Sequence, residues 1–259
     1  MPAELPAILR WTVPGRALVF TLAAGSIACL LGEMYGLCDM RRLFFFMLLP
    51  ATGLLYGIAL LDRGRGDGRL WRGVAIGTLA GLAGAVAYDL FRLPFVFSDA
   101  WGLRGWGIHQ MPLFKVFPRF GALILGQPIE QGVSPGRPGS AWGAGFSLAA
   151  QLLGWLYHFS NGATFGVMFA ALRAGSTEPA APPQKRGATL AWAVLMAVAI
   201  ELCLLASPYA QYFSIPQTTR FVVVTLLAHL VFGLALGGWY ATHVRRWPLR
   251  IATARPAAS

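Results

Sequence analysis

The chain has 259 residues, of which 56% are hydrophobic and only 12% are charged, and its formal net charge is +11. Its mean hydropathy is +0.59, and soluble domains carry roughly twice this share of charged residues. This composition excludes a disordered chain, a collagen-like or disulfide scaffold and an ordinary soluble enzyme. Because the apolar residues come in long blocks, we predict an all-α polytopic membrane protein with one integral membrane domain over residues 1–259.

Six apolar segments are long enough to cross a bilayer core, which takes about 20 residues per helix. They are residues 17–37, 43–61, 73–95, 142–172, 188–207 and 221–242. The first segment is too long for a cleaved signal peptide and has no small-residue cleavage site after it. We therefore expect a bundle of six transmembrane helices.

The connection over residues 96–141 is rich in Trp, Gly and Pro and contains its own apolar stretch at 111–126. Lys115, Pro118 and Arg119 interrupt that stretch, which is too short and too polar to span a membrane. We expect an interfacial or re-entrant segment that lies over the bundle as a lid. Three tryptophans suit an aromatic belt at the same depth: Trp101, Trp106 and Trp142.

Lys and Arg are unevenly divided between the two sides of this topology, with 13 on the side of both termini and 8 on the other. The positive-inside rule then predicts a multi-pass inner (plasma) membrane protein of bacterial type, with both termini and the tail 243–259 in the cytoplasm. The arginines lie in separate connections and form no single patch. We therefore expect membrane lipids as partners and no nucleic acid.

Small residues recur at every fourth position in three of the predicted helices. The positions are Gly73, Gly77, Gly81 and Ala85, then Gly162 and Gly166, then Gly233 and Gly237. Such stripes allow helix backbones to approach closely. They predict a tight bundle, and the same stripes could also join copies of the chain or a larger membrane complex.

Ionisable residues inside the apolar segments carry the functional signal, because each is costly at mid-bilayer and should face protein or water. They are Glu33, Asp89, Arg92, His158, Glu201 and His229. At a rise of about 1.5 Å per residue, four of them lie roughly 6–12 Å below the outer boundary of the membrane: Glu33, Asp89, Glu201 and His229. His158 comes out nearer the midplane, and Gln151 and Asn161 share its helix face. We predict a shared polar pocket in the outer leaflet.

Several of these residues also have a purely structural interpretation. Asp89 and Arg92 are three residues apart and could form an ordinary interfacial ion pair. Glu33 could reach the headgroups, and His158 could make a helix–helix hydrogen bond. Glu201 and His229 lie deeper and have no partner nearby in the sequence.

The chemistry of these residue types leaves several possibilities open. Glu201, His158, His229 and Asp89 are the candidate catalytic residues, and Glu33, Gln151, Asn161 and Arg92 are candidate pocket-lining residues. The cofactor is left unknown: carboxylates and imidazoles could form a dispersed zinc or iron site, although no metal motif occurs. They could equally relay protons. No Gly-x-Ser-x-Gly, P-loop or dinucleotide-binding motif is present.

A helix ending in Asp89-Leu-Phe-Arg92, followed by His158-x-x-Asn161-Gly162-x-x-Phe165-Gly166, resembles a set of uncharacterised bacterial integral membrane proteins. These combine a glycine-rich helix with a later His-x-x-Asn-Gly helix. The resemblance covers about residues 72–172 and brings no known activity. It implies that Asp89, His158 and Asn161 belong together.

Three function classes remain. The first is a membrane protein that binds or modifies a lipid or other apolar molecule in the outer-leaflet pocket. The second is a small proton-coupled transporter that uses the same residues as a relay. The third is a structural or assembly subunit of a membrane complex, in which the polar residues only lock helices together. The inner halves of all six segments are apolar, which favours the first class over a transport path.

Overall fold

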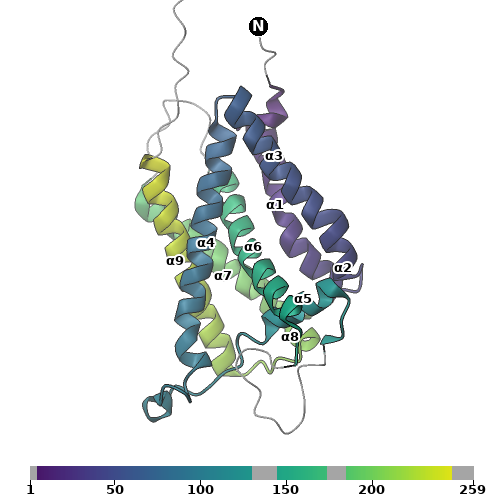
Figure 1. The fold of residues 1–259 in the computed structure, drawn as a ribbon. Coiled ribbons are helices and arrows are strands. Elements are labelled where there is room, and N and C mark those ends of the chain that lie inside the picture. Colours follow the sequence, from purple (N-terminus) through teal and green to yellow (C-terminus); the bar gives the residue numbers. More distant parts are fainter. Residues whose placement is uncertain (1–4, 130–144, 174–184, 247–259) are drawn as a thin grey trace, which may run out of the picture.

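A computed structural model describes residues 5–129, 145–173 and 185–246, and these ranges contain helices and no strand (Figure 1). Five helices are long and apolar enough to cross a membrane. They are α1 (Val13–Met34), the continuous helix formed by α2, η2 and α3 (Met40–Arg65), α4 (Arg69–Val96), α7 (Arg186–Ala206) and α9 (Thr219–Arg246). The predicted all-α membrane bundle is confirmed.

Helix α6 (Leu148–Arg173) occupies the predicted segment 142–172, but it is not among the five helices that meet the length and composition criteria. It lies in the middle of the bundle, where α1, α4 and α5 pack against it. Five candidate spans are therefore established, and a sixth span stays a prediction. Trp142, the linker at 174–184 and the tail beyond 246 lie outside the described residues.

The continuous helix Met40–Arg65 consists of α2 (Met40–Leu43), η2 (Phe44–Leu48) and α3 (Leu49–Arg65). The remaining elements are short: η1 (Ala7–Leu9), η3 (Leu103–Trp106), α5 (Val116–Leu125) and α8 (Tyr209–Tyr212). Helix α5 has only 10 residues, too few to span a bilayer core. The predicted non-spanning segment at 111–126 is thus a short helix.

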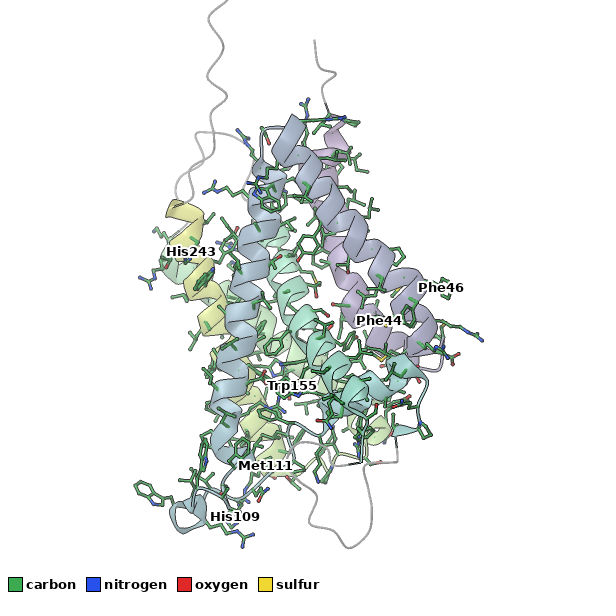
Figure 2. The ribbon with its side chains drawn as sticks, in the orientation of Figure 1. Phe44, Phe46, His109, Met111, Trp155 and His243 are labelled. Atoms are coloured by element: carbon green, nitrogen blue, oxygen red, sulfur yellow. The ribbon has the colours of Figure 1, made fainter. Side chains whose placement is uncertain are left out.

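The π-helical turn η2 lies directly before Pro50. The Leu49 N–H bonds the Phe44 carbonyl, five residues back, and Pro50 has no N–H to continue the ladder. One wider turn lets the chain pass this proline without breaking the helix. Beside it, Phe46 points out of the bundle and is 82% exposed, as expected for a lipid-facing side chain (Figure 2).

The two ends of the bundle are built differently. At the end where α1 begins and α9 ends, here called the terminal end, polar side chains cap helices. The buried Asp62 carboxylate accepts the N–H groups of Leu70 (2.8 Å) and Trp71 (3.0 Å) in the first turn of α4. Arg72 donates to the Val244 carbonyl near the end of α9. These contacts satisfy backbone groups that helix ends leave unpaired.

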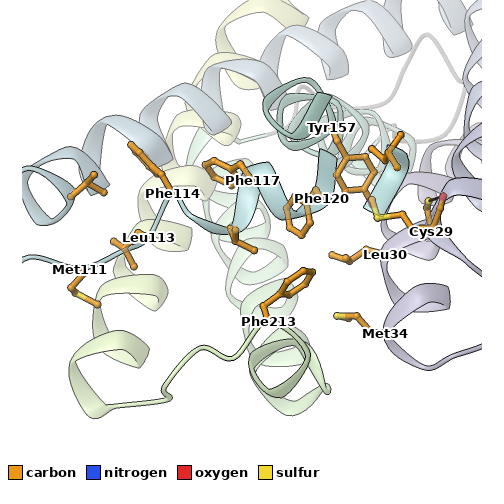
Figure 3. Packing of buried hydrophobic residues seen from close by; sticks show 14 of the residues in the cluster. Cys29, Leu30, Met34, Met111, Leu113, Phe114, Phe117, Phe120, Tyr157 and Phe213 are labelled. Carbon is orange, nitrogen blue, oxygen red and sulfur yellow. Dashed lines mark hydrogen bonds between the residues drawn. The ribbon is translucent and has the colours of Figure 1, made fainter. Parts of the chain in front are cut away.

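At the opposite end, here called the loop end, short helices and loops cover an aromatic core. Phe117 and Phe120 of α5 pack with Tyr157 of α6, Phe213 beyond α8, and Leu30 of α1 (Figure 3). Four segments distant in the sequence therefore share one hydrophobic cluster. This cluster fixes α5 and α8 against the long helices.

Glycines on α4 and α6 bring the two backbones into direct contact. A Cβ atom on Gly81 would collide with the backbone of Gly162, and one on Gly77 would collide with the backbone of Gly166. Gly233 and Gly237 of α9 make close contacts with α7. The predicted stripes are thus buried between helices of one chain, so these glycines offer no surface for a second copy.

We expect Gly81→Ala to destabilise the protein by about 2 kcal/mol, because the added methyl group meets backbone that cannot rotate away. Gly57→Ala is the matched control, since a Cβ there has nothing within 4 Å and gains helix propensity. Thermal unfolding of the detergent-purified variants measures both. Equal midpoints for Gly81→Ala and Gly57→Ala would contradict the packing described here.

Candidate functional site

A cavity of about 590 Å³ lies at the loop end of the bundle. Residues of α4, α6, α7 and α9 form its sides, and α5, α8 and the loop residues 110–115 and 214–218 close it. The described part of the long connection, which contains Met111 (Figure 2), thus contributes to the wall. Most of the long side chains around the cavity are apolar, including Leu30, Phe165 and Phe232.

One acid–histidine pair joins α4 to α6. His158 Nε2 lies 2.8 Å from Asp89 Oδ2, and the side chains are only 14% and 12% exposed. A carboxylate accepts, so Nε2 donates this hydrogen bond. The imidazole also stacks on Phe117, with ring centroids 4.1 Å apart. Both contacts fix the orientation of His158, which itself lines the cavity.

Arg92 accompanies this pair and is almost fully buried. Its Nη1 lies 3.5 Å from Asp89 Oδ1, one turn back on α4, and its Nη2 donates to the Leu113 carbonyl. The guanidinium carbon lies 4.7 Å from the centre of the Tyr88 ring and 5.4 Å from that of Phe117, within cation–π range. Asp89 therefore forms an ion pair with Arg92 and accepts a hydrogen bond from His158. The ion pair and the helix–helix hydrogen bond that the sequence suggested separately thus share one carboxylate.

A second pair joins α7 to α9. His229 Nδ1 lies 3.2 Å from Glu201 Oε2 and 3.0 Å from the Thr225 carbonyl oxygen. A carbonyl oxygen can only accept, so Nδ1 carries a proton. The Glu201 and His229 side chains are 6% and 13% exposed, and both line the cavity.

Tyr88 lies between the two pairs. Its ring centroid is 4.9 Å from that of His229 and 6.0 Å from that of His158. Tyr88 was not predicted as a site residue, although Tyr88 and Arg92 are four residues apart and so share a helix face. Phe117 was not predicted either, because no sequence spacing indicates its stacking on His158.

The predicted site residues divide into two groups. His158, Glu201, His229, Arg92 and Asn161 line the cavity, and Asp89 lies behind its two partners. Four separate helices thus bring these residues together at one end of the bundle. The catalytic role proposed for four of them stays a prediction.

Glu33 and Gln151 were expected to line the pocket but do not line this cavity. Glu33 accepts the Met40 N–H at the start of α2 and the Tyr212 hydroxyl of α8. Burial, together with the Glu33 carboxylate, raises the pKa of Tyr212, which keeps this hydroxyl a neutral donor. Gln151 donates to the Phe146 carbonyl, five residues back. Both side chains satisfy backbone or neighbouring groups at the loop end, which their helical spacing did not reveal.

Among the residues that the structure describes, no group of three or more His, Cys, Asp or Glu side chains is arranged to hold a metal ion. The two acid–histidine pairs remain separate, with Tyr88 between them. Ser160 donates to the Tyr157 carbonyl within its own helix, so it does not face His158 as a nucleophile. What each pair can do chemically is hold, accept and return a proton.

Residues 136–248 match the model of a family of unknown function, DUF6789. The match covers α6, α7 and α9, and with them His158, Glu201 and His229. No curated protein and no solved structure matches the chain.

The buried ion pair on α4 should be sensitive to removal of one partner. We expect Asp89→Leu to lower the free energy of unfolding by about 3 kcal/mol, because it leaves the Arg92 charge buried without its carboxylate. The double variant Asp89→Leu with Arg92→Met should lower the free energy of unfolding by less than the sum of the two single changes. Thermal or denaturant unfolding in detergent measures this cycle.

The exposed pair Asp39–Arg42 provides the control, since its side chains are 70% and 73% exposed. Removing either partner there should cost less than about 1 kcal/mol. If Asp89→Leu costs no more than this control, the buried ion pair contributes nothing to the site.

Proposed function

We propose that the protein is an integral inner-membrane protein that binds a lipid or another amphipathic small molecule in the loop-end cavity. The observation that carries this proposal is the combination of a largely apolar cavity with two acid–histidine pairs at its wall. The cavity volume of about 590 Å³ falls within the range of ligand sites, roughly 300–1,000 Å³.

The shape of the lining supports an elongated ligand. Along α9 the lining residues run from Arg220 through Phe221, Thr225 and His229 to Phe232. The twelve residue steps from Arg220 to Phe232 correspond to about 18 Å at 1.5 Å per residue. Such a length, with apolar residues on the facing helices, fits an acyl or isoprenoid chain better than a small polar metabolite.

The two pairs give the site groups that can act on a bound molecule. With its Nδ1 proton directed to Glu201 and Thr225, His229 keeps Nε2 for a ligand or water. An imidazole held by a carboxylate is a general base in many enzymes. The proposal therefore includes modification of the ligand, by activation of a water molecule or of a ligand hydroxyl group.

The topology predicted from the charges assigns this cavity to the outer leaflet. Both the beginning of α1 and the end of α9 lie at the terminal end (Figure 1), the side with most Lys and Arg residues. With α6 as a sixth span, the cavity faces the periplasmic half of the bilayer. Ligand would then enter from the outer leaflet or from outside the cell.

A proton-coupled transporter is the second candidate, because Tyr88 contacts both imidazoles and could connect two proton-holding pairs. A transport path also needs polar groups through the other half of the bundle. There, the described residues form apolar clusters that contain Val19, Leu55 and Val74 on one side and Ile76 and Leu236 on the other. This packing favours binding at one end over passage through the protein.

A cavity-filling substitution tests the proposed binding. Leu205→Trp on α7 should fill the cavity that Leu205 lines, whereas Leu202→Trp on the same helix replaces a residue that is 52% exposed. Each protein is equilibrated with vesicles of mixed phosphatidylglycerol and phosphatidylethanolamine, purified in detergent and examined by native mass spectrometry.

We expect one lipid molecule to stay on the wild type and on Leu202→Trp at collision energies that remove loosely bound lipid, and to be lost from Leu205→Trp. Thermal unfolding without added lipid checks that both variants are folded. A wild type that retains no lipid, or equal retention by the two variants, would refute the proposal.

A further inference from the structure

Four cationic side chains line the loop-end cavity: Arg92, Lys115, Arg119 and Arg220. Among the described residues that line the cavity, Glu201 is the only acid, and it is paired with His229. Asp89, behind the wall, offsets the charge of Arg92 alone. The three other cations therefore give the cavity a positive charge that the described residues do not neutralise.

Two other cations at this end of the bundle have acid partners, and a third, Arg41, is exposed and does not line the cavity. Arg42 pairs with Asp39 at 3.4 Å, and Arg104 pairs with Asp99 at 2.7 Å, with all four side chains substantially exposed. Cations with acid partners thus lie on the surface outside the cavity. Within the described ranges, Lys115, Arg119 and Arg220 have no acid partner, and they converge on the cavity.

Arg119 adds a second argument. It is only partly exposed, and it donates to the Phe213 carbonyl. Burial lowers the pKa of the Arg119 guanidinium, because removing a charged group from water costs free energy. An anion close to a partly buried cation recovers that cost and gains a charge-assisted hydrogen bond.

Two helix N-termini point the same way. Helix α5 begins at Val116, beside Lys115, and α9 begins at Thr219, beside Arg220; Val116 and Thr218 also line the cavity. The N-terminal end of a helix carries a partial positive charge. The Phe221 N–H at the start of α9 is already bound by the Thr218 hydroxyl oxygen, so the helix dipoles and the cationic side chains are what favour negative charge at the cavity wall.

We propose that the ligand is an anionic amphiphile whose phosphate or carboxylate group is held by Lys115, Arg119 and Arg220. This inference rests on the proposed function and names the class of its ligand. The acid group lies at the loop end, near the start of α9, and the apolar chain runs past Phe221 toward Phe232. The Glu201–His229 pair, about 13 Å further along α9 than Arg220 at 1.5 Å per residue, then lies beside the apolar chain of the ligand.

The test uses the double variant Lys115→Gln with Arg220→Gln, because neither side chain has a structural partner among the described residues. The control is Arg42→Gln with Arg104→Gln, which removes the same charge at the same end but outside the cavity. Arg119 stays unchanged because it also holds the Phe213 carbonyl.

Binding is measured by native mass spectrometry with separate probes: phosphatidylglycerol, a fatty acid, phosphatidylcholine, diacylglycerol and inorganic phosphate. We expect the wild type and the control to prefer phosphatidylglycerol or the fatty acid over diacylglycerol and phosphatidylcholine by about tenfold or more. The cavity variant should lose most of this preference while it still retains a lipid. Added salt should weaken the preference of the wild type.

The outcomes separate this proposal from the binding proposal on which it rests. Equal retention of anionic and uncharged lipids by the wild type, or equal preference in the two double variants, would overturn the anionic ligand and leave lipid binding intact. Failure of the wild type to retain any lipid would overturn both. Binding of inorganic phosphate alone at comparable concentration would assign the anion site to a soluble phosphate compound and overturn the amphiphile.

Discussion

The backbone contact between α4 and α6 sets the positions of all the groups at the site. Gly77 lies against Gly166 and Gly81 against Gly162. The two helices are therefore antiparallel, and moving one turn toward the loop end on α4 corresponds to moving one turn back in the sequence on α6. One turn further, this antiparallel register brings Ala85 opposite His158. Asp89, one turn beyond that, reaches back to the imidazole. Larger residues would separate the helices and break a 2.8 Å hydrogen bond that side-chain flexibility could not restore.

The helices could be predicted from the sequence because each apolar block is bounded by charged or turn residues. Most helix ends lie within four residues of the predicted ones, and the shared depth of Asp89, Glu201 and His229 followed from counting residues from the helix ends. Counting placed His158 nearer the midplane, whereas the structure pairs it with Asp89 at the cavity. Depth along a helix is readable in this way because its rise is constant. The direction in which a side chain faces around the helix axis cannot be read in this way, because it depends on which helices pack against that face. Glu33 has a similar depth but faces α2 and α8.

A shared pocket with a lid at 111–126 was predicted, but the complete wall of the cavity was not, because α8 and the loop at 214–218 also contribute to it. Helices α5 and α8 and the segment at 214–218 place Lys115, Arg119 and Ser214 at the wall. In the sequence, Lys115 and Arg119 only showed that their segment does not cross the membrane. The same two charges exclude a membrane-spanning role for the segment and line the cavity, and the second role can be seen only in the tertiary structure. Tyr88 was missed for a similar reason, since a tyrosine in an apolar helix has many ordinary uses.

The two short helices at the loop end are held by different kinds of contact. Helix α5 lies with Gly121 against the Ala150 backbone, while Gly154 of α6 lies against the Phe117 backbone. Helix α8 is held through side chains, including the Tyr212 hydroxyl on Glu33 and the ring of Phe213, its C-terminal cap, on Phe120 of α5. Side chains can exchange rotamers and backbone contacts cannot, so a displacement of α5 would disturb the glycine contacts with α6. Of the two short helices that close the cavity, α8 is the one whose displacement would leave the glycine-packed helices in place.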